Sequence, residues 1–422
     1  MLDLRRLREA PDETLRALRS KSPQVDLDEI LALDKRRIQL LQESEGLKAE
    51  RNRATREIAD LQKGGGDATA RIAAMRQLGE RVKALDAELK EADERQQHLL
   101  MRLPNTPHPD TPVGRNETEN VEIARWGAPP AFAFTPRNHL ELGEALGILD
   151  FPRGAKIAGS GFPVYKGLGA RLERALINFM LDLQTLEHGY TEIFPPFLAN
   201  RESMTATGQL PKMEEDMYLC GKDELFAIPT AEVPITNLHR DELLAGEDLP
   251  LRYAGYSACF RREAGSYGRE VRGFLRVHQF NKVELVQFTR PEESDAALEA
   301  LRGHAEEVLR RLGLHYRVLA LCTGDLSFAS ARTYDLEVWS PAEGRFLECS
   351  SCSTFTDFQA RRGNMRFRDK GGKPQFLHTL NGSGLATSRL IVALLECNQN
   401  AEGAITVPAA LRPYLGGLER IG

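Results

Sequence analysis

The sequence has little of what marks a membrane-bound, secreted or disulfide-linked protein. It contains six cysteines among 422 residues, at irregular spacing, and no apolar run of about eighteen residues that could cross a bilayer. Its first ten residues, MLDLRRLREA, are charged where a secretory signal would be apolar. These absences argue against a disulfide framework, a secretory signal and a membrane partner, and we expect a reduced, cytoplasmic compartment.

The sequence also lacks a basic overall charge and the common motifs of phosphate and metal binding. With 61 acidic and 56 basic residues its net charge is −5, so a surface that binds nucleic acid must be a local basic patch. No G-x-x-x-x-G-K-[ST] motif is present. The lone C-x-x-C formed by Cys349 and Cys352 has no second pair of ligands, so we expect no zinc site and place both cysteines on a buried strand.

Proline is absent between Gln24 and Leu103, and this stretch has the pattern of two long helices. Its second half repeats apolar residues at intervals of three and four, as a coiled coil does, and its first half has a looser version of the pattern. Three consecutive glycines in KGGGDAT, Lys63 to Thr69, separate the halves. We therefore predict a long antiparallel helical arm over about 27–102. The apolar positions of its second half are Ile72, Met75, Leu78, Val82, Leu85, Leu89 and Ala92.

Basic side chains gather on both predicted helices, and two interpretations of them remain open. The arm could be a spacer or a dimerisation element whose charges form a solvated face. Alternatively, basic side chains on a rigid rod could follow the phosphate backbone of a nucleic acid. The residues concerned are Lys48, Arg51, Arg53, Arg56, Arg71, Arg76, Arg81 and Lys83.

A segment with four prolines, Leu103 to Gly114, marks a linker, and the pattern changes after it. We predict an N-terminal domain over 1–108 and a second domain over 109–422. In the second domain a helical stretch from Gly167 to Glu187 accompanies strands that mostly follow one another without helices between them, which predicts an antiparallel sheet flanked by helices and an α+β fold. The predicted strands include Leu225–Pro229, Phe274–Phe288, Tyr316–Leu321, Tyr334–Trp339 and Phe346–Ser350.

One predicted β-hairpin, from Cys259 to Val286, carries more charge than a core element needs. Arg261 and Glu263 are two residues apart, and Arg276, Phe280 and Glu284 are evenly spaced on the return strand, so each set shares a face. Arginine suits phosphate oxygens, a phenyl ring can stack on a purine, and a carboxylate can accept from an amine. The set predicts an ATP site, unless the charges simply pair with each other on an exposed sheet.

Three further segments carry candidate site residues. In TLNGSGLATSR small residues alternate before a helix with Arg389 in its first turns, which allows close approach of a ligand. Thr230 and Glu232 follow a strand and could bind a small polar substrate, although Thr230 could equally be a helix N-cap. Glu348 and Ser351 lie among apolar residues, where an acid could hold Mg²⁺ on phosphate oxygens.

Together these segments resemble the bacterial-type seryl-tRNA synthetase family, over essentially the whole chain. GYTEIFPPFL, with Pro196, resembles motif 1 of the class II synthetases, FRREAGSYGREVRGFLRVHQFNKVE resembles motif 2, and NGSGLATSR resembles motif 3. The segments TAE, TYDLEVW and ECSSCSTFTDFQARR resemble seryl-specific stretches. The TAE, AGSYGRE and ECSSCS stretches together make the resemblance specific.

The resemblance implies a set of site residues. Arg261 would contact the α-phosphate of ATP and Arg389 the γ-phosphate, as the two catalytic residues. The implied serine-binding residues are Thr230, Ala231, Glu232, Glu284 and Ser383. The implied ATP-binding residues are Arg261, Arg262, Glu263, Val277, Phe280, Glu348, Cys349, Ser350, Ser351 and Arg389. Glu348 and Ser351 would hold Mg²⁺ with the nucleotide.

The resemblance also implies the reaction and the partners. ATP would activate L-serine to seryl-adenylate, and the seryl group would pass to the 3′ end of tRNA(Ser), with tRNA(Sec) as a second acceptor. The protein would be a homodimer built around motif 1, with an N-terminal tRNA-binding arm. Alternatives are a ligase that loads a carrier protein, a threonine or proline enzyme of the same fold, and an inactive coiled-coil adaptor. The chain departs from the family pattern at Arg262, Arg332, Thr387, Ser388 and Cys397.

Overall fold

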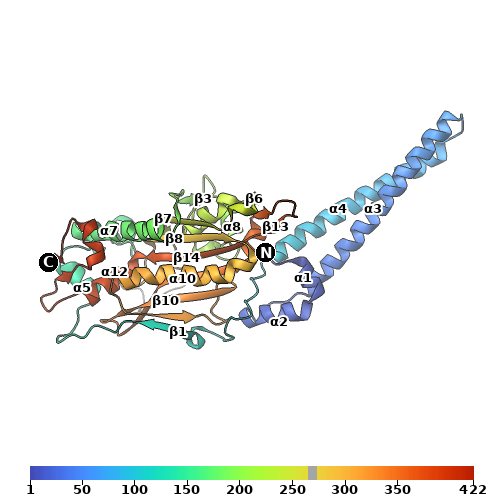
Figure 1. Cartoon of the computed structure of the whole chain (residues 1–422). Helices are drawn as coiled ribbons and strands as arrows, with labels where there is room; N and C mark the ends of the chain where they lie inside the picture. The colour runs from blue at the N-terminus through green and yellow to red at the C-terminus, as the bar shows by residue number, and fades with distance from the viewer. Residues whose placement is uncertain (265–272) are drawn as a thin grey trace. The chain divides into compact units, whose positions relative to one another are not determined.

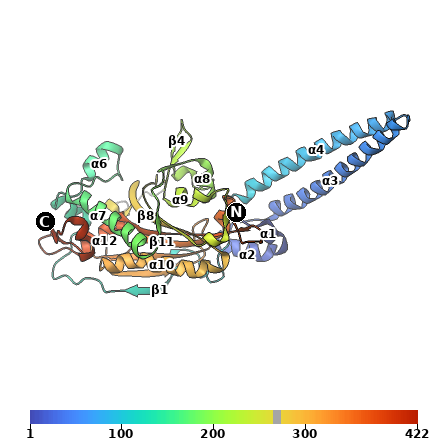
Figure 2. The same ribbon diagram turned by 45° about the horizontal axis from the view of Figure 1, so that its top comes forward.

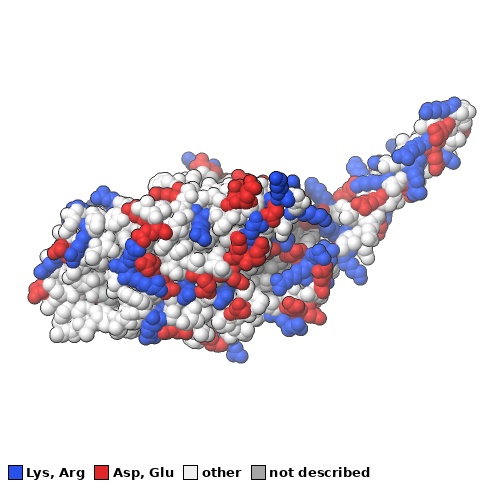
Figure 3. All heavy atoms as spheres, viewed as in Figure 1, with Lys and Arg blue, Asp and Glu red and all other residues white. Residues whose placement is uncertain are grey.

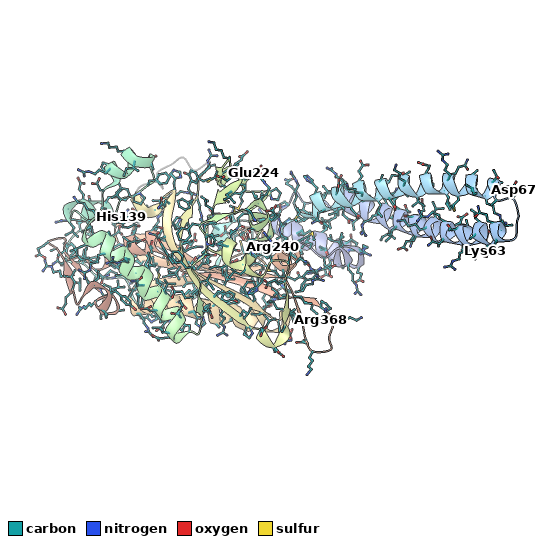
Figure 4. All side chains as sticks on the ribbon, turned by 90° about the horizontal axis from the view of Figure 1, so that it is seen from above. Lys63, Asp67, His139, Glu224, Arg240 and Arg368 are labelled. Atoms are coloured by element: carbon teal, nitrogen blue, oxygen red, sulfur yellow. The ribbon has the colours of Figure 1, made fainter. Side chains whose placement is uncertain are left out.

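The computed structural model describes residues 1–264 and 273–422, and the chain forms two compact units, Met1–Pro104 and Asn105–Gly422 (Figure 1). The first unit is helical. Two short helices, α1 (Leu4–Glu9) and α2 (Pro11–Lys21), precede two long ones, α3 (Asp28–Lys63) and α4 (Thr69–Leu100). The long helices run antiparallel, with Lys63 and Asp67 at the far end of the hairpin (Figure 4). The predicted helical arm is confirmed.

The two long helices are held together by a narrow apolar seam and by ion pairs. Leu40 of α3 packs with Leu85 and Ala92 of α4 near the middle of the hairpin. Ile72 is 45% exposed although it falls at a predicted seam position, whereas Ile58 of α3 and Val82 of α4 are buried. Among the described residues, five ion pairs cross between the helices, each worth at most about 1 kcal/mol at the surface. They are Arg36–Glu88, Arg37–Asp93, Lys48–Asp86, Arg71–Glu57 and Arg95–Glu29.

The second unit is built on an eight-stranded sheet in the order β1-β9-β10-β11-β14-β8-β7-β2 (Figures 1 and 2). Neighbouring strands pair antiparallel, as predicted, with the exception of the short edge strand β2, which pairs parallel to β7. The strands are β1 (Val121–Trp126), β2 (Thr191–Glu192), β7 (Leu251–Phe260), β8 (Gln279–Thr289), β9 (Tyr316–Ala320), β10 (Arg332–Ser340), β11 (Arg345–Thr356) and β14 (His378–Ala386).

Helices cover one face of this sheet and leave the centre of the other face for a site. Residues of α7 (Leu168–Asp182), α10 (Ser294–Arg311) and α12 (Thr387–Cys397) form one buried core with alternate residues of the strands, such as Val283 and Leu285 of β8. Because successive side chains of a strand point to opposite faces, the residues between them face away from this core.

Smaller elements surround the central sheet. Two three-stranded sheets have the orders β3-β5-β4 and β13-β12-β6. No helix among the described residues is long and apolar enough to cross a membrane. The remaining helices are α5 (His139–Ala145), α6 (Phe151–Ala158), α8 (Arg201–Ala206), α9 (Glu232–Thr236) and α11 (Phe358–Arg362). The remaining strands are β3 (Leu198–Ala199), β4 (Tyr218–Cys220), β5 (Leu225–Ala227), β6 (Leu243–Ala245), β12 (Arg366–Arg368), β13 (Gln375–Phe376), β15 (Ile405–Thr406) and β16 (Arg420–Ile421).

Candidate active site

A cavity of about 530 Å³ lies on the face of the central sheet that the helices leave open. Side chains of β8, β11 and β14 form part of its lining, and loops close its sides. The structure brings most of the predicted site residues together here, although they come from segments as far apart in sequence as Thr230 and Arg389. Those in the lining are Thr230, Glu232, Arg261, Glu263, Val277, Phe280, Glu284, Glu348, Cys349, Ser350, Ser351, Ser383 and Arg389.

Two predicted site residues do not line the cavity. The Ala231 side chain is buried in a separate apolar core with Ile235 and Val286. Arg262 is exposed, and its backbone N–H donates to the carbonyl oxygen of Asp216 at 2.9 Å. Both residues are adjacent in the sequence to residues that line the cavity. The resemblance implied whole segments, so it included them.

A buried carboxylate with three partners forms one end of the cavity. Glu284 of β8 is inaccessible to solvent. Its Oε2 accepts from the Thr230 hydroxyl at 2.7 Å and its Oε1 from Asn381 Nδ2 at 3.1 Å. Lys282, which is also buried, forms an ion pair with it. Lys282 and Asn381 were not predicted, yet the alternation Phe280-Lys282-Glu284 along one strand would have placed Lys282 on the same face.

Glu232, at the start of α9, is a second buried carboxylate at this end. Burial, and then the negative charge of Glu284, raise the pKa of Glu232 to about 7. Its Oε1 accepts from Gln359 Nε2 at 2.7 Å, and Gln359 in turn accepts from the Thr379 hydroxyl at 2.7 Å. Gln359 therefore fixes the orientation of Glu232. Gln359 lies in the ECSSCSTFTDFQARR stretch of the resemblance but was not named as a site residue; its side chain approaches from α11, 127 residues away in sequence.

An arginine, a phenyl ring and an ion pair form the middle of the cavity. The sequence predicted that Arg261 and Glu263 share one face of a strand. This prediction is wrong, because strand β7 ends at Phe260 and both residues lie in the connection after it. The Arg261 guanidinium lies 5.1 Å from the centre of the Phe280 ring. Glu263, which has a left-handed backbone with φ of 52°, forms an ion pair with Arg276. Glu263 and Arg276 therefore pair with each other, as the alternative interpretation of this hairpin predicted for its charges.

The start of helix α12 forms the far end. Arg389 Nη1 donates to the Glu348 carbonyl oxygen at 2.8 Å and lies 3.2 Å from its carboxylate, and Nε donates to the Leu275 carbonyl at 3.2 Å. These bonds direct the guanidinium along the cavity wall. Glu348 is about half-exposed, and Ser351 lies on the same strand, β11.

The donors at this end fit a magnesium ion that arrives with phosphate. Glu348 and Ser351 offer oxygen ligands, which Mg²⁺ prefers, and it commonly takes only one or two carboxylates together with substrate phosphates and water. No group of three or more His, Cys, Asp or Glu side chains suited to a metal ion is found among the residues that the structure describes. The protein would therefore supply part of the coordination and the nucleotide the rest.

The two cysteines of the C-x-x-C lie on β11 with buried thiols. Cys349 Sγ donates to the carbonyl oxygen of Leu336 at 3.4 Å. Burial raises the pKa of both thiols, that of Cys352 to about 12. Both side chains belong to the buried core of the second unit, and Cys349 also lines the cavity. Of the AGSYGRE stretch, Gly265 to Glu270 lie outside the described residues.

Comparison with known proteins covers the whole chain. Residues 1–107 match the family model "Seryl-tRNA synthetase N-terminal domain", and residues 217–398 match "tRNA synthetase class II core domain (G, H, P, S and T)". The serine–tRNA ligase of Pelobacter propionicus is 55% identical over the full length of both chains. The chain belongs to the serine–tRNA ligase family. The family member from Chlorobium phaeovibrioides is 57% identical, with 99% of this chain and 98% of the relative covered.

A solved structure of the family agrees with the fold. The seryl-tRNA synthetase from Pyrococcus horikoshii, determined in complex with ATP, has a TM-score of 0.95 and 38% identity, and the match covers 100% of this chain and 99% of that one. The resemblance to this family and the predicted class II fold are confirmed.

The departures from the family pattern lie at different depths around the cavity. Ser388 lines it, next to Arg389. The Thr387 hydroxyl points away from it and donates to Glu173 at 2.5 Å. Arg332 stacks 5.1 Å from the ring centre of Tyr334, and Cys397 donates to the Trp339 carbonyl at 3.5 Å. Of the five departures, only Ser388 is among the residues that line the cavity.

Proposed function

We propose that the protein joins L-serine to tRNA(Ser), with tRNA(Sec) as a second acceptor, and that ATP activates the amino acid in the cavity described above. The observation that carries this proposal is the arrangement of one cavity with buried carboxylates at one end and arginines at the other, in a chain related over its full length to serine–tRNA ligases. An amino acid suits the first end, and a nucleotide phosphate suits the second.

Serine would bind at the end formed by Thr230, Glu232 and Glu284, close to Ser383. Two carboxylates can accept hydrogen bonds from its ammonium group and its hydroxyl. The polar groups at this end favour a side chain that carries a hydroxyl. A site that bonds a hydroxyl leaves its own polar groups unpaired when the ligand lacks one, which rejects such an analogue by a factor of about 10⁴ or more.

ATP would lie along the cavity from Phe280 to Arg389. The Phe280 ring would stack on adenine, Glu263 would accept from the adenine amino group, and backbone near Val277 would contact the nucleotide. Arg261 would then meet the α-phosphate and Arg389 the γ-phosphate. Cys349 and Ser350 would contribute mainly through their backbone, because both side chains are buried.

The reaction needs no nucleophilic side chain. A serine carboxylate oxygen attacks the α-phosphorus, the bond to the bridging oxygen breaks, and pyrophosphate leaves. Arg261 stabilises the charge that builds on the phosphoryl oxygens, which is the main catalytic requirement of such transfers. The terminal ribose hydroxyl of the tRNA then attacks the carbonyl carbon of seryl-adenylate, and AMP leaves.

Glu348 and Ser351 would hold Mg²⁺ when the nucleotide is bound. The ion supplies positive charge that neutralises the phosphate oxygens during the transfer. Within the chain, the Arg389 guanidinium lies 3.2 Å from the Glu348 carboxylate and helps to hold that side chain in place.

The helical arm would bind the tRNA. Figure 3 shows Lys and Arg side chains along it, and several of them are exposed and make no ion pair among the residues described. Unpaired cations are the ones free to contact phosphates, and their contribution falls as salt rises. The unpaired arginines on the arm include Arg53, Arg56, Arg76 and Arg81.

A homodimer is part of the proposal. Leu186 and Phe194, which flank the short edge strand β2 of the motif 1 segment, have 78% and 76% of their surface exposed. Exposed large apolar groups beside an unpaired sheet edge favour association with a second copy. We expect a cytoplasmic dimer, and sedimentation velocity at micromolar concentration would reveal a monomer if this part is wrong.

Serine-dependent exchange of labelled pyrophosphate into ATP tests the proposed function directly. We expect exchange with serine and, at equal concentration, none above background with alanine; threonine should also be inactive because of its extra methyl group. Equal exchange with alanine would contradict the serine assignment. Transfer to tRNA(Ser) transcript in the same preparation tests the second step.

A further inference from the structure

A buried carboxylate lies behind the cavity, on the helical face of strand β8. Glu173 of α7 has only 5% of its surface exposed. Its Oε1 accepts from Asn281 Nδ2 at 2.6 Å and from the Thr387 hydroxyl at 2.5 Å. The same hydroxyl is 3.1 Å from the Asn281 carbonyl oxygen. One carboxylate oxygen therefore joins β8 to the first residue of α12.

Both partners of Glu173 are next to residues that line the cavity. Asn281 lies between Phe280 and Lys282 on β8, and because strand side chains alternate, it faces the helices while they face the cavity. Thr387 comes two residues before Arg389 at the start of α12. Glu173 itself is not in the cavity lining.

Keeping a carboxylate at this place costs stability. Burial raises the pKa of Glu173 to about 7. Its Oε2 and the nearby Tyr165 hydroxyl have no hydrogen-bond partner within the described part of the chain. An apolar side chain of similar volume would avoid this desolvation, so packing alone does not account for the residue.

We propose that Glu173 is a positioning residue for ATP, which ties β8 to the first turn of α12 and thereby fixes the Arg389 guanidinium in the cavity. The proposal rests on the γ-phosphate role proposed for Arg389. Without the carboxylate, the first turn of α12 loses its link to β8, and a small displacement of Arg389 is enough to weaken its contact with a phosphate.

Pyrophosphate exchange with separate titrations of ATP and serine tests this role. For Glu173→Ala we expect the KM for ATP to rise about tenfold, while the KM for serine changes less than about twofold, because Glu284 and Thr230 are not linked to Glu173. Thr387→Val, which removes the hydroxyl at nearly constant shape, should raise the KM for ATP about threefold. Glu173→Gln keeps an oxygen acceptor and should remain within about twofold of wild type.

A matched control and a double-mutant cycle separate positioning from general stability. Thr289→Val, on the same strand, removes a buried hydroxyl that has no hydrogen-bond partner among the described residues, and should leave both KM values unchanged. In an Arg389→Ala background, Glu173→Ala should cost less than about twofold more in kcat/KM for ATP, because the two residues act through one contact.

Several outcomes would overturn the proposal. They are a KM for ATP within twofold of wild type in the Thr387→Val variant, equal changes in the two KM values, and losses that multiply in the double mutant. Thr387→Val decides the question if Glu173→Ala does not fold. A wild-type protein without serine-dependent exchange overturns both the proposed function and this role, whereas an active wild type with unaffected variants overturns only the role of Glu173.

Discussion

At the scale of single residues, the cavity shows how neighbouring charges receive different environments. Arg261 lies in the lining and stacks near Phe280, whereas Arg262, the next residue, lies outside the lining, although both residues are exposed. Glu284 has three partners, whereas Glu232 has one direct side-chain donor, Gln359. Sequence position alone does not separate such pairs, because the direction of each side chain depends on where the strand ends.

The two adjacent arginines give a matched pair of variants. Arg261→Ala should lower the rate of adenylate formation about a hundredfold, which corresponds to about 3 kcal/mol for one contact with a developing phosphoryl charge. Arg262→Ala removes the same charge one residue further on and should change the rate less than about threefold. Single-turnover formation of seryl-adenylate measures both; activity of Arg261→Ala within a few fold of wild type would show that the α-phosphate role is wrong.

Glu232 predicts a pH dependence for serine. With a pKa of about 7, raised chiefly by burial, its carboxyl is protonated at lower pH and ionised at higher pH. An ammonium group binds the ionised form, so kcat/KM for serine should fall towards tenfold per pH unit below about pH 7 and level off above it. The cavity groups that face Glu232 electrostatically are Glu284, Lys282 and Arg261.

Glu232→Gln is the test of that assignment. The variant should bind serine more weakly and lose the slope between about pH 5.5 and 7, because an amide does not titrate. Glu173 has a similar pKa but contacts the other face of β8, so its Gln variant should keep the slope. A wild-type profile for serine that is flat across this range would exclude Glu232 as the ammonium ligand.

At the scale of elements, the sequence pattern predicted the helices of the arm well, because their formation depends on residues close together in the sequence. The apolar spacing and the three glycines of the arm gave two helices within a few residues of their observed ends, since these features act within a helix and its partner. The predicted strand from Phe274 begins only at Gln279, because residues 273–275 form a 3-10 turn that carries the chain past the cavity. The parallel edge strand β2 has two residues, too few for any periodicity.

The arm offers a test of its charges that leaves the cavity untouched. Four exposed arginines without ion pairs in the described chain can be replaced together, namely Arg53, Arg56, Arg76 and Arg81. We expect aminoacylation of tRNA(Ser) to fall, with the largest loss relative to wild type at low salt, because the contribution of these cations falls as salt rises; serine-dependent pyrophosphate exchange should stay unchanged. The control replaces four cations that already pair with acids, namely Arg36, Lys48, Arg71 and Arg95. If both sets of replacements lowered aminoacylation equally, the result would favour the interpretation of the arm as a spacer whose charges serve only solubility.

At the scale of the whole molecule, the predicted division of labour between the arm and the rest of the chain stays a prediction, and the cavity lies in one unit. All cavity-lining residues lie between Thr207 and Arg389, in the unit Asn105–Gly422. The side-chain contacts of Gln359, Asn381 and Glu173 were not predicted, because each residue reaches its partner from a segment that is distant in the sequence. The resemblance of a segment to a family indicates which residues belong to the site, but it does not show which other side chains orient those residues.

Removal of the first unit tests this division. Arg8 pairs with Asp34 of α3, so the short helices belong with the arm and Met1–Pro104 should be deleted as a whole. Because every residue assigned to serine or ATP lies in the remaining unit, pyrophosphate exchange should stay within a few fold of the full chain. Transfer to tRNA(Ser) should fall by orders of magnitude, since most of the proposed phosphate contacts are lost. Thermal unfolding of the shortened protein serves as the folding control, and aminoacylation at the full rate would mean that the tRNA is held by the catalytic unit alone.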